Sequence, residues 1–157
     1  LKIYQRILDS GIERGIIFED DAIPDKQLFN LDVKFFKEAD LILLYHLNTY
    51  VPWNIFAERK GAGTLPVRNS PFMACAYVIS AAACKYIIDH AYPVTRCADW
   101  PIDLTKINAV AAWPFLASHN DSYPSNLHAG RRKYRKSKKN FTYFRKKISK
   151  LISKKIA

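Results

Sequence analysis

The sequence predicts an α/β fold, in which helices alternate with the strands of a central sheet. Two short apolar runs, "GIIFE" at residues 15–19 and "DLILLYHL" at 40–47, have the length and continuity of buried strands. A stretch with helical spacing of apolar residues precedes each run, and a third apolar run at 73–79 is followed by another such stretch. The order helix, strand, helix, strand is typical of α/β layering with parallel strands.

The chain opens with a predicted helix and strand. "LKIYQRILDSG" places Ile3, Ile7 and Leu8 at helical spacing and ends at Gly11, a common helix stop. The run at 15–19 then has the continuous apolar pattern of a strand covered on both faces.

Two further helices are expected. In "KQLFNLDVKFFKEA", residues 26–39, four apolar side chains lie close to one helical face: Leu28, Leu31, Phe35 and Phe36. After the strand at 73–79, Ser80 is expected to cap a helix from 81 to 90, because a serine side chain accepts a hydrogen bond from the first helical turn. From 93 to 126, four prolines and few periodic signals predict loops and short elements.

Length and composition favour one domain with an appendage. The chain has 157 residues, of which 49% are hydrophobic, enough to bury one core. No apolar run reaches the roughly 18 residues that suggest a membrane-spanning helix, and the first residues lack the order of a secretory signal, so we expect a non-secreted protein. Cys75, Cys84 and Cys97 include no close CxxC pair, which predicts reduced, mostly buried thiols.

The positive charge is concentrated at the carboxyl end. Residues 131–157 hold 13 of the 25 Lys and Arg and no Asp or Glu. The first 130 residues therefore carry 12 basic against 14 acidic side chains, a net charge of −2, although the whole chain carries +11. This shift predicts a globular domain over 1–130 followed by a cationic tail over 131–157.

Three consecutive carboxylates, Glu19, Asp20 and Asp21, follow the first predicted strand. Adjacent carboxylates repel one another and resist desolvation, so their position at the end of a buried strand suggests a cation among them. The carboxyl ends of strands in open α/β sheets border the ligand site, and oxygen ligands suit Mg²⁺ or Mn²⁺. An acidic triplet is also commonplace as a solvated loop, and the triplet alone does not separate the two interpretations.

Five blocks of the sequence, in this order, resemble glycosyltransferase family 25, the lipooligosaccharide galactosyltransferase group: "LKIYQRILDSGIERGIIFEDDAIPD", "DLILLYHL", "GAGTLPVRNSPFMACAYVISAAACKYII", "YPVTRCADWPIDL" and "SHNDSYPSNL". The resemblance covers residues 1 to about 130, with similar spacing. It implies a GT-A-like, Rossmann-type nucleotide-sugar transferase domain with an Asp-x-Asp type metal motif. Members of the family carry a further strand and loop upstream of the first block, so we expect a catalytic domain that lacks its N-terminal part.

By this resemblance, Glu19, Asp20 and Asp21 match the acidic motif that binds a divalent ion, Mn²⁺ or Mg²⁺, and through it the diphosphate of a UDP-hexose donor. Asp21 is expected to be the most direct ligand, with Asp20 or Glu19 completing the site or holding the donor's ribose. The chemistry needs such a site, because a bound cation stabilises the charge that develops on the departing nucleoside diphosphate.

Asp99, in "CADWPID", matches a characteristic acidic position of the family and is the expected catalytic base of an inverting transferase. The family's reaction moves a hexose, galactose or glucose, onto bacterial lipooligosaccharide or lipopolysaccharide. An inverting transfer needs a base that takes the proton of the acceptor hydroxyl. Asp is equally favoured as a helix cap or turn former before Trp100 and Pro101, so that alternative stays open. Asp103 is the second choice for the base.

The last block supplies further candidates. His119 is expected as an additional metal ligand by analogy with GT-A enzymes, and Asn120 and Ser125 as hydrogen-bonding groups for the donor. A polar loop with Pro124 also needs no function to explain it. Three aromatic residues could stack on an acceptor sugar or serve as core and loop anchors: Tyr50, Trp53 and Phe56.

The tail has the pattern of a basic amphipathic helix. In "NFTYFRKKISKLISKKIA" apolar residues recur every three or four positions, with Lys and Arg between them. We expect residues 131–157 to lie on an anionic membrane surface, the inner face of the bacterial inner membrane, beside a lipid-linked saccharide acceptor. The expected membrane contacts include Lys146, Lys147, Lys150 and Lys154.

A second function class stays open at this point. The chain would then be a non-catalytic basic module that binds an anionic membrane or nucleic acid, a relic of a truncated transferase, with an incidental acidic triplet. Nucleic acid is the less favoured partner, because phosphate contact does not require regular apolar spacing. Metal-dependent binding of a UDP-sugar separates the two classes.

Overall fold

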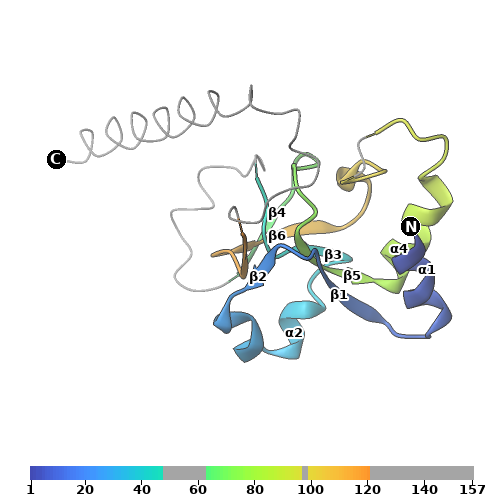
Figure 1. Cartoon of the computed structure of the whole chain (residues 1–157). Coiled ribbons are helices and arrows are strands. Elements are labelled where there is room, and N and C mark those ends of the chain that lie inside the picture. Colours follow the sequence, from blue (N-terminus) through green and yellow to red (C-terminus); the bar gives the residue numbers. More distant parts are fainter. Residues whose placement is uncertain (48–62, 97–98, 121–157) are drawn as a thin grey trace, which may run out of the picture. The chain divides into compact units, whose positions relative to one another are not determined.

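The computed structural model describes residues 1–47, 63–96 and 99–120, which belong to one compact unit, Leu1–Asn120 (Figure 1). The unit is a mixed α/β arrangement, as the sequence predicts. In chain order its elements are α1 (Lys2–Asp9), β1 (Arg14–Phe18), β2 (Ala22–Pro24), the 3₁₀ helix η1 (Lys26–Asn30), α2 (Val33–Phe36), β3 (Leu41–Leu43), β4 (Gly63–Pro66), β5 (Ala76–Ser80), α4 (Ala81–His90), the 3₁₀ helix η2 (Leu104–Lys106), β6 (Ala109–Trp113) and β7 (Ala117–His119).

The central sheet has five strands in the order β1-β5-β3-β6-β4. β1 and β3 both pair antiparallel with β5, β3 pairs in parallel with β6, and β4 pairs antiparallel with β6. A separate two-stranded sheet joins β2 to β7. The prediction of parallel strands is therefore wrong for most neighbours in the described sheet, because β5 runs in the opposite direction between β1 and β3.

Although β5 separates them, β1, β3 and β6 run in the same direction. The two antiparallel pairings with β5 and the parallel pairing of β3 with β6 require it. Their three carboxyl ends therefore lie at one edge of the sheet, where β4 and β5 begin. Neighbouring strands are about 4.8 Å apart, so the ends of β1 and β6 lie roughly 15 Å from each other.

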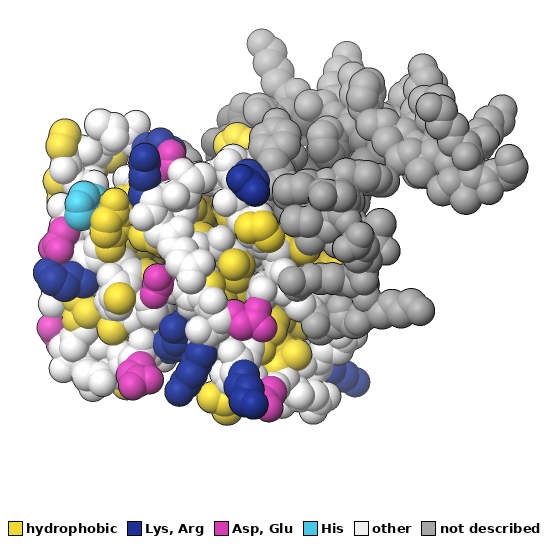
Figure 2. All heavy atoms as spheres, turned by 180° about the vertical axis from the view of Figure 1, so that it is seen from behind, with side chains coloured by type: hydrophobic (Ala, Val, Ile, Leu, Met, Phe, Trp, Pro, Cys, Tyr) yellow, Lys and Arg dark blue, Asp and Glu magenta, His cyan; other side chains and the backbone are white. Residues whose placement is uncertain are grey.

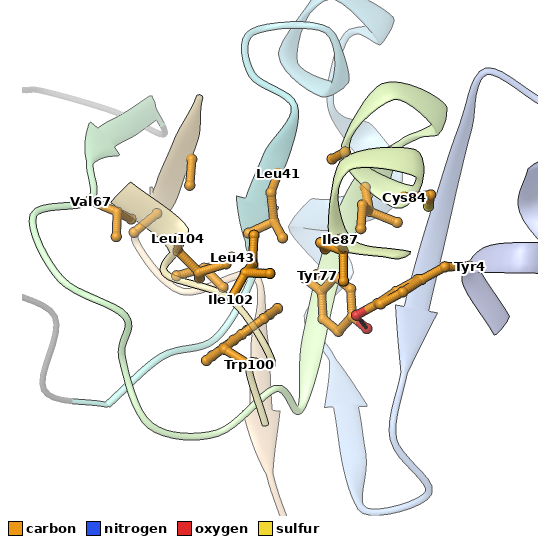
Figure 3. Close-up of a cluster of buried hydrophobic side chains, with 14 of the residues drawn as sticks. Tyr4, Leu41, Leu43, Val67, Tyr77, Cys84, Ile87, Trp100, Ile102 and Leu104 are labelled. Carbon is orange, nitrogen blue, oxygen red and sulfur yellow. Dashed lines mark hydrogen bonds between the residues drawn. The ribbon is translucent and has the colours of Figure 1, made fainter. Parts of the chain in front are cut away.

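Apolar side chains cover both faces of this sheet. One core contains residues from α1 and α4, and in it the hydroxyls of Tyr4 and Tyr77 lie 2.8 Å apart (Figure 3). The second core is closed by η1 and α2 through Leu28 and Phe35. Successive residues of β3 divide between the two cores, because side chains alternate along a strand.

Two predicted helices are confirmed. α1 ends just before Gly11, which adopts a φ of +65° in the left-handed region that glycine enters without steric cost. α4 spans Ala81–His90, and the Ser80 hydroxyl caps it by accepting the Ala83 N–H at 3.1 Å.

Other predictions are corrected. The helix expected over 26–39 is broken into η1 and α2, because Leu31 is extended and the Asp32 side chain starts a new helix by accepting the Lys34 N–H. The strand expected to be covered on both faces is the edge strand β1, and no described element covers its second face fully, since Ile16 is 48% exposed and Phe18 39%. β5 begins later than the predicted strand at 73–79.

The described residues between 93 and 120 form short elements, as predicted, and one of these elements is a strand of the central sheet that the sequence did not indicate. Between 93 and 126, where loops and short elements are expected, the structure has η2, β7 and the five-residue strand β6. β6 lies inside the sheet between β3 and β4. Its alanine-rich sequence, "AVAAW", carries a weak strand signal, which explains the omission.

Candidate functional site

The acidic triplet forms a tight turn at the carboxyl end of β1. Glu19 continues the pairing of β1 with β5, since its N–H donates to the Cys75 carbonyl at 2.8 Å. The Ala22 N–H then donates to the Glu19 carbonyl at 3.1 Å and closes the turn through Asp20 and Asp21. The turn leads the chain from the five-stranded sheet into β2, and it leaves Asp20 exposed.

Asp21 is the acid of this turn that lies beside His119. β2 pairs with β7 in a register that places Ala22 opposite His119, and the Asn120 N–H donates to the Asp21 carbonyl at 2.8 Å. In the side chains, His119 Nε2 lies 2.8 Å from Asp21 Oδ2. Strand pairing thus brings together two residues that the sequence places in separate blocks.

The second carboxylate oxygen of Asp21 is buried without a partner. Oδ1 has no hydrogen bond among the described residues, although the whole side chain is 27% exposed. A buried, unsatisfied carboxylate oxygen costs free energy, so it calls for a specific explanation. One explanation is a cation bound when the site is loaded.

Glu19 lies in the negative field of its neighbours. Partial desolvation raises the pKa of its carboxyl, and the charges of Asp21, Asp99 and Asp20 raise it further, while His119 acts in the opposite sense. These contributions place Asp99 within electrostatic range of the acidic turn. The charge of Asp99 thus acts on Glu19, and a common site for Asp99 and the triplet stays a prediction.

Asp99 has a defined structural contact. Its Oδ2 accepts the backbone N–H of Met73 at 3.1 Å, just ahead of β5. Met73 has a φ of +73°, in the left-handed region that side chains other than glycine seldom adopt. Asp99 thus holds a strained loop in place, which differs from the cap before Trp100 that the sequence offered as its structural alternative.

Asp103, the second choice for the base, has a structural role. Its carboxylate caps η2 by accepting the Thr105 N–H at 3.1 Å, and it pairs with Arg96 at 3.1 Å. The hydrogen bond from the Thr105 backbone lowers the pKa of Asp103, with smaller contributions from the Thr105 hydroxyl, Arg96 and Ser70. These contacts explain the position of the Asp103 side chain, so no catalytic role is needed to explain it.

The predicted metal ligands are only partly assembled. Within residues 1–47, 63–96 and 99–120, no three His, Cys, Asp or Glu side chains form a group that could hold a metal ion. Asp21 and His119 are in contact, and their 2.8 Å spacing fits either a direct hydrogen bond or two neighbouring ligands of an octahedral ion, which lie about 2.9 Å apart. Carboxylate and imidazole are suitable ligands for a divalent ion, and among the described residues Asp21 and His119 supply two such groups in contact.

The described cysteines are free, buried thiols. Burial raises the pKa of Cys75 to about 11, with further effect from the charges of Asp21 and Glu19, and burial raises that of Cys84 to about 11 as well. Both thiols therefore stay protonated at neutral pH. This confirms the prediction of reduced thiols for these two residues, and it gives Cys75 no nucleophilic character beside the acidic turn.

An aromatic cluster that the sequence analysis missed lies at the same edge of the sheet. Tyr45 and His46 follow β3, Trp113 ends β6, and Phe115 comes two residues later. Ring centroids are 5.3 Å apart for Tyr45 and Phe115, 4.8 Å for His46 and Phe115, and 6.2 Å for Trp113 and Phe115. Recognising β6 as a strand would have revealed the cluster, because its end then aligns with that of β3.

Several predicted residues fall in parts of the chain that the structure does not describe. They are Ser125, the aromatic residues Tyr50, Trp53 and Phe56, the thiol of Cys97, and the tail with Lys146, Lys147, Lys150 and Lys154. The predicted domain boundary at residue 130 also lies there. Asn120 is described, and its backbone joins the end of β7 to Asp21.

Figure 2 shows apolar, acidic and basic side chains interspersed over the described part of the face opposite to that of Figure 1. No helix among the described residues has the length and apolar character needed to cross a membrane. Comparison of the chain with protein-family models and with curated proteins finds no match.

Proposed function

We propose that this chain is a metal-dependent, inverting glycosyltransferase that moves a hexose, galactose or glucose, from a UDP-sugar onto a lipid-linked bacterial saccharide. One observation carries the proposal: among the described residues Asp21 Oδ1 is buried without a hydrogen-bond partner, beside His119 and close enough to Glu19 for their charges to interact. A carboxylate in that position is stabilised by a cation. The five sequence blocks that resemble family 25 supply the substrate class.

The residues that would hold the ion are Asp21 and His119, with Glu19 as a further oxygen donor. Burial raises the pKa of Glu19 most, neighbouring carboxylates raise it further, and a divalent cation beside them would lower it. When bound, Mn²⁺ or Mg²⁺ would offset the charge of the donor diphosphate as the bond to the sugar breaks. Asp20, exposed at the tip of the turn, is the group left to contact the donor's ribose.

Asp99 is the proposed base. Its contact with the Met73 N–H fixes one carboxylate oxygen and so limits rotation of the group. A fixed carboxylate at the edge of the site can accept the proton of an acceptor hydroxyl while that oxygen attacks the anomeric carbon. Asp103 is not proposed for this step, because its oxygens are engaged with η2 and Arg96.

Donor titration tests the proposal. UDP-galactose and UDP-glucose are titrated calorimetrically into the full chain with and without Mn²⁺, and binding should require the metal. Asp21→Asn should abolish metal-dependent binding. Asp89→Asn, which removes the same charge from the exposed end of α4, should leave it unchanged. Equal binding with and without Mn²⁺, or in the wild type and Asp21→Asn, would refute the metal role.

The cationic tail favours a second, membrane-binding function that can accompany catalysis or replace it. Residues 131–157 hold 13 Lys and Arg and no acid. Each basic residue near an anionic surface contributes about 1 kcal/mol, so such a segment suffices for reversible docking. Deleting 131–157 should release the protein from phosphatidylglycerol vesicles in a sedimentation assay, and undiminished sedimentation would rule the role out.

A further inference from the structure

The edge of the sheet that carries the acidic turn also carries two partly exposed aromatic rings. Trp113 is 37% exposed and Phe115 38%, and their rings meet at an interplanar angle of 78°. We call this pair the aromatic corner. Large aromatic side chains stabilise a fold most when they are buried, so two neighbouring rings that each keep over a third of their surface exposed suggest a binding role.

Neighbouring rings and backbone hydrogen bonds hold the aromatic corner in position. Tyr45 and His46 each meet the Phe115 ring edge to face, with interplanar angles of 68° and 87°. His46 is 8% exposed, and burial lowers its pKa to about 4, so it packs as a neutral ring at physiological pH. The Leu44 carbonyl fixes the following chain by accepting the N–H groups of Leu116 and Ala117 at 2.9 and 3.2 Å. The corner is therefore a rigid feature of the site edge.

The aromatic corner and the acidic turn lie at the same edge of the sheet. Phe115 precedes His119 by four residues, which span at most about 14 Å of extended chain. Trp113 ends β6, and Glu19 follows β1, whose carboxyl end faces the same way. The corner and the Asp21–His119 pair are thus separate groups on one edge.

We propose that the aromatic corner binds the pyranose ring of the acceptor saccharide. The face of an aromatic ring carries partial negative charge and matches the C–H face of a pyranose, which is apolar and slightly positive. An apolar surface with a few polar groups near it is the usual composition of a ligand site, and the acidic turn lies at the same edge without forming part of the corner. The identification of this sugar as the acceptor rests on the proposed transferase function.

Saturation-transfer NMR on the full chain tests the corner without metal or nucleotide. The probes are methyl β-D-galactopyranoside and methyl β-D-glucopyranoside, with D-mannitol as an acyclic polyol that has hydroxyls but no pyranose face. At least one glycoside should receive saturation on its ring protons, whereas mannitol should not. Equal transfer to mannitol, or none to either glycoside, overturns the proposal.

Substitutions locate the binding. Trp113→Leu and Phe115→Leu keep apolar volume without a ring, and each should weaken glycoside binding by about fivefold or more. Trp113→Phe should restore much of the affinity. Phe29→Leu removes a 74% exposed ring on η1 and should have no effect. Wild-type affinity in both leucine variants contradicts the proposal, and using two positions keeps the test informative if one variant does not fold.

The two proposals fail separately in these experiments. Asp21→Asn should abolish metal-dependent donor binding and leave glycoside binding unchanged, because the corner does not include the acidic turn. A negative donor titration therefore refutes the transferase proposal alone. If Asp21→Asn loses as much glycoside binding as Trp113→Leu, the aromatic corner is not a binding site separate from the acidic turn, and the corner proposal is refuted.

Discussion

His119 Nε2 lies 2.8 Å from Asp21 Oδ2, although the two residues belong to opposite ends of the described chain. The contact follows from the backbone, since β2 and β7 pair with Ala22 opposite His119 and the Asn120 N–H bonds to the Asp21 carbonyl. The side chains meet because the strands that precede and follow them are already aligned. The pair is therefore built into the fold before any ligand is bound.

Glu19→Gln should stabilise the protein increasingly as the pH rises. In the folded protein the pKa of Glu19 is raised above its ordinary value of 4.5, so the folded state binds more protons than the unfolded state between the two pKa values. The wild-type protein is therefore destabilised by Glu19 as the pH rises from the ordinary pKa of this carboxyl through its raised pKa in the folded state. The difference in melting temperature between Glu19→Gln and wild type, measured by circular dichroism, should grow from about pH 4 to about pH 7.

Glu13→Gln is the control for that series, since it removes a charge from the loop before β1 without touching the acidic turn. A constant difference between Glu19→Gln and wild type at every pH would show that burial and the neighbouring carboxylates do not raise the pKa of Glu19. If the proposed metal site forms, added Mn²⁺ should reduce this difference in melting temperature, because the cation offsets the repulsion between Glu19 and the neighbouring carboxylates.

His46→Phe should protect the fold in mild acid. Burial lowers the pKa of His46 from 6.5 to about 4, so the unfolded chain takes up a proton between these values that the folded protein does not. Wild-type stability from this group is present above pH 6.5 and is lost as the pH falls toward 4. The free energy of unfolding of His46→Phe, taken relative to that of the wild type, should be roughly 2 kcal/mol higher at about pH 5 than at about pH 8.

Urea unfolding at the two pH values measures that gain. His90→Phe is the control, because His90 is exposed on α4 and bonds through Nδ1 to the Tyr86 carbonyl of its own helix. If His46→Phe changes the free energy of unfolding equally at both pH values, the imidazole is not held neutral by burial.

Met73→Gly should be more stable than Met73→Ala by roughly 0.5–1 kcal/mol. Both variants remove the side chain, but the φ of +73° at this position is strained for alanine and free of strain for glycine. At Lys85, exposed inside α4, the order should reverse, with alanine about 1 kcal/mol better than glycine. Chemical denaturation of the four variants gives both comparisons, and the same order at both positions would contradict the strained loop.

Gly15→Ala should be rescued by Ile7→Val. A Cβ at Gly15 would lie 2.9 Å from Ile7 Cδ1, an atom that valine lacks. The alanine substitution should therefore be about 1 kcal/mol more favourable in the Ile7→Val background than in the wild type. A double-mutant cycle from urea unfolding measures this coupling, and additive effects would show that α1 does not pack on β1 as closely as described.

The sequence predicts elements well where a local signal is strong. Ser80 and the apolar spacing that follows fix α4, and Gly11 marks the end of α1, because capping and left-handed glycine are properties of neighbouring residues. The same locality explains the error over 26–39. There the apolar spacing continues across Asp32, whose side chain stops one helix and starts another.

Strand pairing could not be predicted in this way. Whether β1 lies beside β3 or beside β5 depends on contacts between distant segments, and an apolar run such as "GIIF" fits an edge strand as well as a central one. For the site, the sequence places Asp21 and His119 in two blocks, and the register of β2 with β7 supplies their contact. The Met73 contact of Asp99 likewise depends on tertiary structure.

The candidate carboxylates are attached to different sheets. Asp21 and His119 sit on the β2–β7 ribbon, whereas Asp99 is tied to the segment that leads into β5 of the five-stranded sheet. The ribbon is nevertheless held against the larger sheet, because the Ala117 N–H donates to the Leu44 carbonyl at 3.2 Å and Ala22 and Ala117 pack in the second core. The packing between ribbon and sheet therefore sets the spacing between the Asp21–His119 pair and Asp99, and substitutions in that packing would change it.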